Sequence, residues 1–172
     1  MKILQALIDV VGFMSDRSGK LVSWINVILV ISITYDVIMR YVFSAPTNWS
    51  YTLSYMLGAT MFCIGQAYVH RINGHVRVDL LYVKFSQKTK FLLDLIFTIL
   101  FFLPAFFMVA RSLWENFFYS FHVQEKAIHS TWYPITWPYK FLIAIGLSLF
   151  VIQGVIRLIE DFRSLVKGGS PS

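Results

Sequence analysis

Two charged residues one helical turn apart are the sharpest candidates for chemistry in this sequence. Asp36 and Arg40 fall inside a long apolar run, so a helix would place them on one face. Ionisable side chains within a membrane span are costly unless they are paired or hydrated, and they often mark an ion or substrate pathway. The competing interpretation is structural, with Arg40 reaching the membrane surface while Asp36 neutralises it or bonds a neighbouring helix. We favour the structural interpretation, because one such pair lacks the oxygen-rich cage that a sodium site needs.

The histidines and the single cysteine offer no other reactive centre. A membrane cytochrome holds its haem iron with histidines that project from facing helices. His70 and His75 flank one polar loop, and His122 and His129 lie in another connection, so none falls in the middle of an apolar run. Cys63 lies inside an apolar run with no base at a comparable depth, and one cysteine cannot form an internal disulfide. We therefore expect no catalytic residue, no cofactor and no metal site, and we expect that the protein is not an enzyme.

The composition is that of a membrane protein. Of 172 residues, 57% are hydrophobic and 14% are charged, whereas soluble domains average about 25% charged residues. This is more apolar surface than one soluble core of this size could bury, so a phospholipid bilayer is the natural solvent. The net charge of +6 could suggest nucleic acid, but the cations border apolar runs and form no single basic face. The sequence predicts an all-α integral membrane four-helix bundle with no nucleic-acid partner.

Four apolar runs are each long enough to cross a hydrocarbon layer of about 30 Å, and we treat residues 1–172 as one membrane domain. Residues 1–20 carry apolar side chains at helical spacing, which predicts an amphipathic helix in the membrane interface that breaks at Ser18-Gly19-Lys20. A second short interfacial helix is expected over residues 76–85. The proline at position 104 predicts a kink in the third span. The predicted spans are residues 21–43, 49–69, 91–113 and 138–159, with a polar tail over residues 160–172.

The distribution of basic residues predicts the orientation. Residues 71–90 hold five of the fifteen Lys and Arg residues and one acid, Asp79. Short loops rich in Lys and Arg stay on the cytoplasmic side of a membrane. With four spans, both termini share that side, which then carries eleven of the fifteen cations. We predict cytoplasmic termini (N-in/C-in) and two hairpin tips that face outward.

Several residues are expected to pack helices against each other or against a partner. Small residues such as Gly58 allow close backbone approach, and Gln66 lies among them. Gly146, Gln153 and Arg157 share one face of the last span. The full set of structural or partner-interface candidates is Asp36, Arg40, Trp49, Gly58, Gln66, Asp79, Gly146, Gln153 and Arg157.

Taken in order, several segments resemble the small (Q-type, DctQ-like) integral membrane subunit of tripartite ATP-independent periplasmic (TRAP) transporters. The resemblance covers roughly residues 30–159. Relatives usually follow the tryptophan equivalent to Trp49 with two glutamates, whereas this chain has Tyr51 and Thr52 at the matching positions. The similar segments are Asp36-Val-Ile-Met-Arg40-Tyr-Val-Phe43 with Pro46 and Trp49, His75-Val-Arg-Val-Asp79-Leu-Leu81, Trp132-Tyr-Pro134-Ile-Thr-Trp137-Pro138, and Gly146 to Gln153.

This resemblance implies a division of labour in a bacterial inner membrane. A large membrane subunit would bind sodium and an organic anion, a periplasmic substrate-binding protein would deliver that anion, and the small subunit would brace the scaffold. The substrate could be a dicarboxylate, a sialic acid or a sulfonate. Two alternatives stay open at this point: a redox membrane anchor of cytochrome type, and a free-standing structural membrane protein.

Overall fold

The computed structural model describes residues 2–72, 85, 87–128 and 131–166. Within them the chain is helical, and the one β-type pairing is an isolated bridge between Lys126 and Ile135. The predicted interfacial helix over 76–85 lies outside the described residues except for Phe85, and so does Asp79. The elements are α1 (Lys2–Tyr41), α2 (Ser50–Arg71), α4 (Gln87–Phe97), the π-helical turn η1 (Thr98–Phe102), α5 (Leu103–Val123) and α6 (Trp137–Val166).

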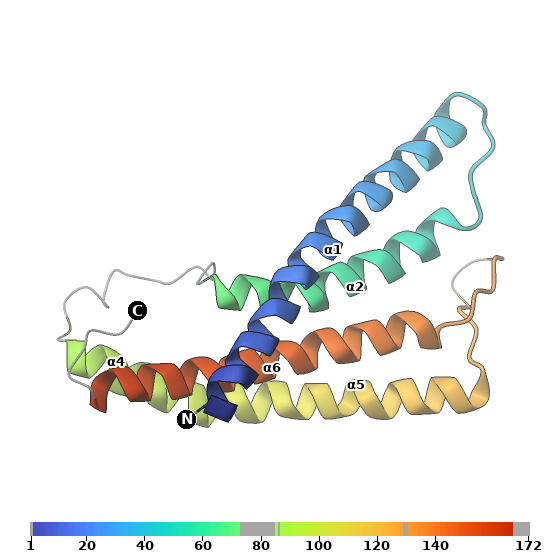
Figure 1. Ribbon diagram of the computed structural model, residues 1–172. Coiled ribbons are helices and arrows are strands. Elements are labelled where there is room, and N and C mark those ends of the chain that lie inside the picture. Colours follow the sequence, from blue (N-terminus) through green and yellow to red (C-terminus); the bar gives the residue numbers. More distant parts are fainter. Residues whose placement is uncertain (1, 73–84, 86, 129–130, 167–172) are drawn as a thin grey trace.

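The helices form an open row rather than a closed bundle (Figure 1). The described elements make four rods, since α4, η1 and α5 follow one another as a single rod. α2 packs between α1 and α6, and α5 packs on the other side of α6, so the order across the row is α1, α2, α6, α5. The loop 42–49 and the connection 124–136 lie at one end, which we call the connection end. The start of α1 and the last turns of α6 lie at the opposite, terminal end (Figure 1).

α1 is continuous through the position where the sequence predicts a break. The Ser18 hydroxyl donates a hydrogen bond of 2.6 Å to the Ser15 carbonyl, which keeps this polar residue within the helix. Gly19 lies against Tyr68 of α2, and a Cβ atom at Gly19 would come within 2.7 Å of that ring. The predicted break is therefore wrong, because these small residues serve close packing against α2.

The third rod contains a π-helical turn where the sequence predicts a proline kink. Pro104 lacks a backbone N–H and cannot continue an α-helical ladder. The Leu103 N–H reaches back five residues to the Thr98 carbonyl, which is the wide hydrogen bond of a π turn. This turn lies in the residues just before Pro104 and sets the position of the Phe102 ring.

α5 extends ten residues beyond the predicted end of the third span, to Val123. Glu115 does not end the helix, because its carboxylate accepts a 2.8 Å bond from Arg111 Nε one turn earlier. Trp114 Nε1 donates a 2.9 Å bond to Ser148 Oγ of α6, which ties this extension to its neighbour. Gln124 then takes a left-handed conformation (φ 48°), and this ends the helix. The connection is therefore residues 124–136.

α2 and α6 meet backbone to backbone at a glycine. A Cβ atom at Gly146 would lie 2.7 Å from the backbone nitrogen of Ile64, so only glycine allows this approach. The small hydrophobic core lies beside this contact, among α2, α5 and α6. Its buried members are Ala67, Ala110, Leu147 and Phe150.

Three of the four rods contain segments long and apolar enough to cross a membrane. These are Val10–Tyr41, Leu92–Val123 and Trp137–Glu160. α2 is not among them, because serine, threonine, glycine and glutamine residues lower its hydropathy. The helix that is least apolar therefore lies inside the row, with a rod on each side.

Candidate functional site

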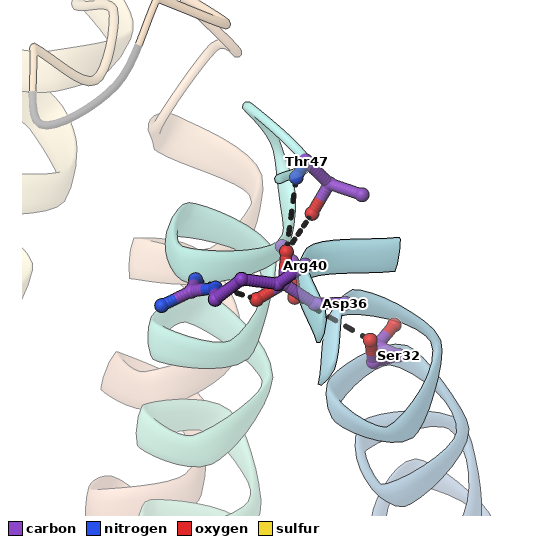
Figure 2. A network of polar contacts seen from close by, with 5 residues as sticks. Ser32, Asp36, Arg40 and Thr47 are labelled. Carbon is purple, nitrogen blue, oxygen red and sulfur yellow. Dashed lines mark hydrogen bonds and ion pairs between the residues drawn. The ribbon is translucent and has the colours of Figure 1, made fainter. Parts of the chain in front are cut away.

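Asp36 joins the end of α1 to the loop that follows it (Figure 2). Its Oδ1 accepts hydrogen bonds from both the backbone N–H of Thr47, at 3.1 Å, and the Thr47 hydroxyl. Its Oδ2 accepts a 2.7 Å bond from Arg40, as the four-residue spacing predicts. Asp36 is almost fully buried, while the Arg40 side chain is 55% exposed. The Asp36 carboxylate therefore fixes the loop to the end of α1, and we call this set of hydrogen bonds the Asp36 hook. The exposed Arg40 side chain compensates the charge of Asp36.

Further contacts fasten the first turn of α2 to α1 beside this hook. The Ser50 hydroxyl donates a 3.4 Å bond to the carbonyl of Ser32, which lies one turn before Asp36. The rings of Tyr35 and Trp49 stack with centroids 5.9 Å apart. Trp49, a residue singled out in the sequence, thus packs within the chain. Thr47 was not predicted, because a loop residue eleven positions away has no periodic relation to Asp36.

A second polar cluster closes the connection end between α5 and α6. Lys140 Nζ lies 2.6 Å from Glu125 Oε2 and 2.8 Å from Asn116 Oδ1. The hydrogen bond from Lys140 is the main cause that lowers the pKa of Glu125 from its ordinary value; the Ser120 hydroxyl adds to it, and partial burial opposes it. The ammonium group is the more buried partner, with 12% of the Lys140 side chain exposed. Sequence spacing could not reveal this pair, since its members are fifteen residues apart on different elements.

The connection itself is held by short-range hydrogen bonds. The Ala127 N–H donates to the Pro134 carbonyl, and the Thr136 N–H donates to the Glu125 carbonyl, each at 2.9 Å. The hydroxyls of Ser120 and Thr136 are 2.7 Å apart and buried. Between this connection and the first turns of α2 and α6 lies a cavity of about 150 Å³. Tyr51 and Thr52 form part of its wall.

An aromatic cluster surrounds His70 near the terminal end. Its imidazole stacks on Phe102 with centroids 5.6 Å apart and meets Phe150 edge-on at 5.3 Å. Phe102 in turn lies against Gly154, where a Cβ atom would come within 2.3 Å of the ring. The π turn and a glycine of α6 together make room for this ring. The histidine is packed among carbon rings, an environment that suits a structural role.

The remaining sequence candidates are distributed along the rods. Gln153 is buried on α6, and Arg157 Nη1 donates a 3.4 Å bond to the His70 carbonyl. Gly58 faces Leu29 of α1 at an ordinary distance of 3.9 Å, while Gln66 is half-buried on α2. The structure thus brings Arg157 into contact with α2. The Asp36 hook lies apart from Arg157, at the connection end. The described cavity at the connection end is lined by none of these predicted residues.

Among the residues that the structure describes, no group of three or more His, Cys, Asp or Glu side chains could hold a metal ion. The polar clusters of the connection end are ion pairs and hydrogen bonds that fasten helices and loops to one another. These contacts fix the relative positions of the long apolar rods. The fold and these contacts define a multi-pass helical membrane protein whose polar clusters join its helices and loops.

Comparison with known proteins gives the family. Residues 29–164 match the family described as tripartite ATP-independent periplasmic transporters, DctQ component. The chain belongs to this family, and the resemblance read from its motifs is confirmed. It is accordingly a component of a transporter and not an enzyme. No curated protein and no solved structure matches the chain.

Proposed function

We propose that the chain is the small membrane subunit of a TRAP transporter and braces a large transport subunit. That subunit would carry out sodium-driven uptake of an organic acid, which a periplasmic binding protein delivers. The main support, beside family membership, is the large apolar surface that the open row leaves uncovered. In the most apolar 18-residue stretches of the first and third rods, 6% and 0% of the residues are buried. A scaffold subunit requires such surface for lipid and for a membrane partner.

We further propose four crossings of the bacterial inner membrane, with α2 as the crossing that composition alone does not identify. A rod at the centre of the row can be less apolar than its neighbours, because they shield part of it from lipid. The excess of Lys and Arg near the terminal end favours cytoplasmic termini. The connection end would then face the periplasm, where the binding protein arrives.

The decisive experiment is coexpression of the tagged chain with the large membrane subunit of a TRAP transporter. We expect the two to copurify, and we expect vesicles that hold both subunits to take up the acid in the presence of the binding protein and a sodium gradient. Vesicles that hold the large subunit alone should show little uptake. A small chain that purifies alone, together with undiminished uptake in its absence, would refute the scaffold role.

A further inference from the structure

The cavity at the connection end has no place in the scaffold role and is the strongest candidate for a binding site. Its volume is about 150 Å³, room for about five water molecules at their liquid volume and enough for one phosphate group. Three elements enclose it: α2, the connection and the start of α6. Three tyrosines and two threonines are among its lining residues. The lining residues are Tyr51, Thr52, Tyr55, Met56, Glu125, Lys126, Ala127, Ile128, Thr136 and Tyr139.

The charges around the cavity favour an anion. Two charged side chains line it, Glu125 and Lys126. The charge of Glu125 is compensated by the 2.6 Å ion pair with Lys140, whereas Lys126 is exposed. The summed charge of Glu125, Lys140 and Lys126 is therefore +1.

The helix ends add to this positive potential. α2 begins at Ser50 and α6 at Trp137, so the cavity lies beside the N-termini of two long helices. A helix N-terminus carries about half a positive elementary charge and attracts anions. The Tyr51 hydroxyl is a suitable donor to a phosphate oxygen. Lys126, Tyr51 and two helix ends thus border one small space.

The position of the cavity indicates the source of the anion. Trp49 and Trp137 lie next to the first turns that line it, and such aromatic residues mark the depth of lipid headgroups. We propose that this cavity binds the phosphate group of an anionic phospholipid headgroup, with Lys126 and the Tyr51 hydroxyl as its main contacts. The proposal does not depend on the transport role, because it uses this chain's own residues.

The test measures binding of short-chain phosphatidylglycerol to the full-length chain in detergent, together with any subunit that copurifies. Lys126→Gln should raise the Kd about fivefold, the effect expected for one cation near an anionic surface. Tyr51→Phe should raise it by a smaller factor. Both side chains are exposed, so neither change endangers folding. Lys20→Gln removes an equally exposed lysine on α1, far from the cavity lining, and should leave the Kd unchanged.

A parallel experiment with inorganic phosphate distinguishes a site for the phosphate group alone from a site for the whole lipid headgroup. Competition with the lipid would show that the phosphate group alone fills the cavity, and a lack of competition would assign the site to the whole headgroup. Both results support the anion site. A wild-type Kd in both Lys126→Gln and Tyr51→Phe would overturn it, and so would a loss of affinity in Lys20→Gln as large as in Lys126→Gln.

Discussion

Replacement of Gly146 by alanine tests whether the backbone contact between α2 and α6 holds the row together. The new Cβ would lie 2.7 Å from the Ile64 nitrogen and 2.8 Å from the Cys63 carbonyl carbon. Backbone atoms within a helix cannot move aside as a flexible side chain can, so the two helices must separate. Overpacking of this kind typically costs about 1–3 kcal/mol. For a chain of this size, that cost corresponds to a melting temperature lower by roughly 2–12 °C.

Gly58→Ala is the matched control. It lies on a helix of the same row, and its Cβ would meet Leu29 Cδ1 at 3.9 Å, an ordinary contact. Both substitutions gain the same helix propensity, up to about 1 kcal/mol, so the difference between the two isolates the steric contact. Both melting temperatures are measured by heating the detergent-purified variants and quantifying the remaining folded protein by size-exclusion chromatography. If Gly146→Ala melts at or above the temperature of Gly58→Ala, the close approach of α2 and α6 is refuted.

Three further changes test the polar contacts. Asp36→Asn keeps an oxygen for the loop but loses the charge that pairs with Arg40, so its melting temperature should fall below wild type and stay above that of Asp36→Ala; identical values for all three proteins would contradict the hook. In Glu125→Gln the ion pair with Lys140 is lost. Because the folded-state pKa of Glu125 is lowered, the pair stabilises the protein above the ordinary carboxyl value of 4.5, and this stabilisation disappears as the pH falls through the lowered pKa. Melting curves of wild type and Glu125→Gln should therefore differ at pH 7 and converge as the pH falls below the ordinary carboxyl value, and a constant difference would exclude this pair as the cause. Trp114→Phe removes the 2.9 Å bond to α6 and should cost about 1 kcal/mol, whereas an unchanged melting temperature would show that this bond contributes nothing.

Local patterns in the sequence predicted the contacts that are local in the chain. Asp36 and Arg40 form an ion pair because a helix fixes residues four apart on one face. The four apolar runs likewise predicted the four rods. Their ends were less predictable. The predicted break at Ser18-Gly19-Lys20 is absent because Gly19 packs against Tyr68, and α5 runs past the predicted end at residue 113, where Glu115 pairs with Arg111.

Contacts between elements that are distant in the chain could not be predicted from the sequence. The partner of Asp36 in the loop, Thr47, and the partner of Glu125 on α6, Lys140, depend on how helices cross. The length of the apolar run predicted a span over residues 49–69, but it could not show that α2 lies inside an open row. The order of helices across a membrane domain follows from side-chain fit, which a hydropathy pattern does not contain.

The hairpin of α1 and α2 is fastened at both of its ends. At one end, Asp36 hooks the loop; at the other, Arg71 Nη1 meets Asp16 Oδ2 at 2.8 Å and Tyr68 fills the space beside Gly19. A slide of one helix past the other by a single turn, about 5.4 Å, would break every one of these contacts at once. α1 and α2 should therefore move as one rigid body. A force applied at the loop would be transmitted along the whole hairpin without a shift of one helix relative to the other.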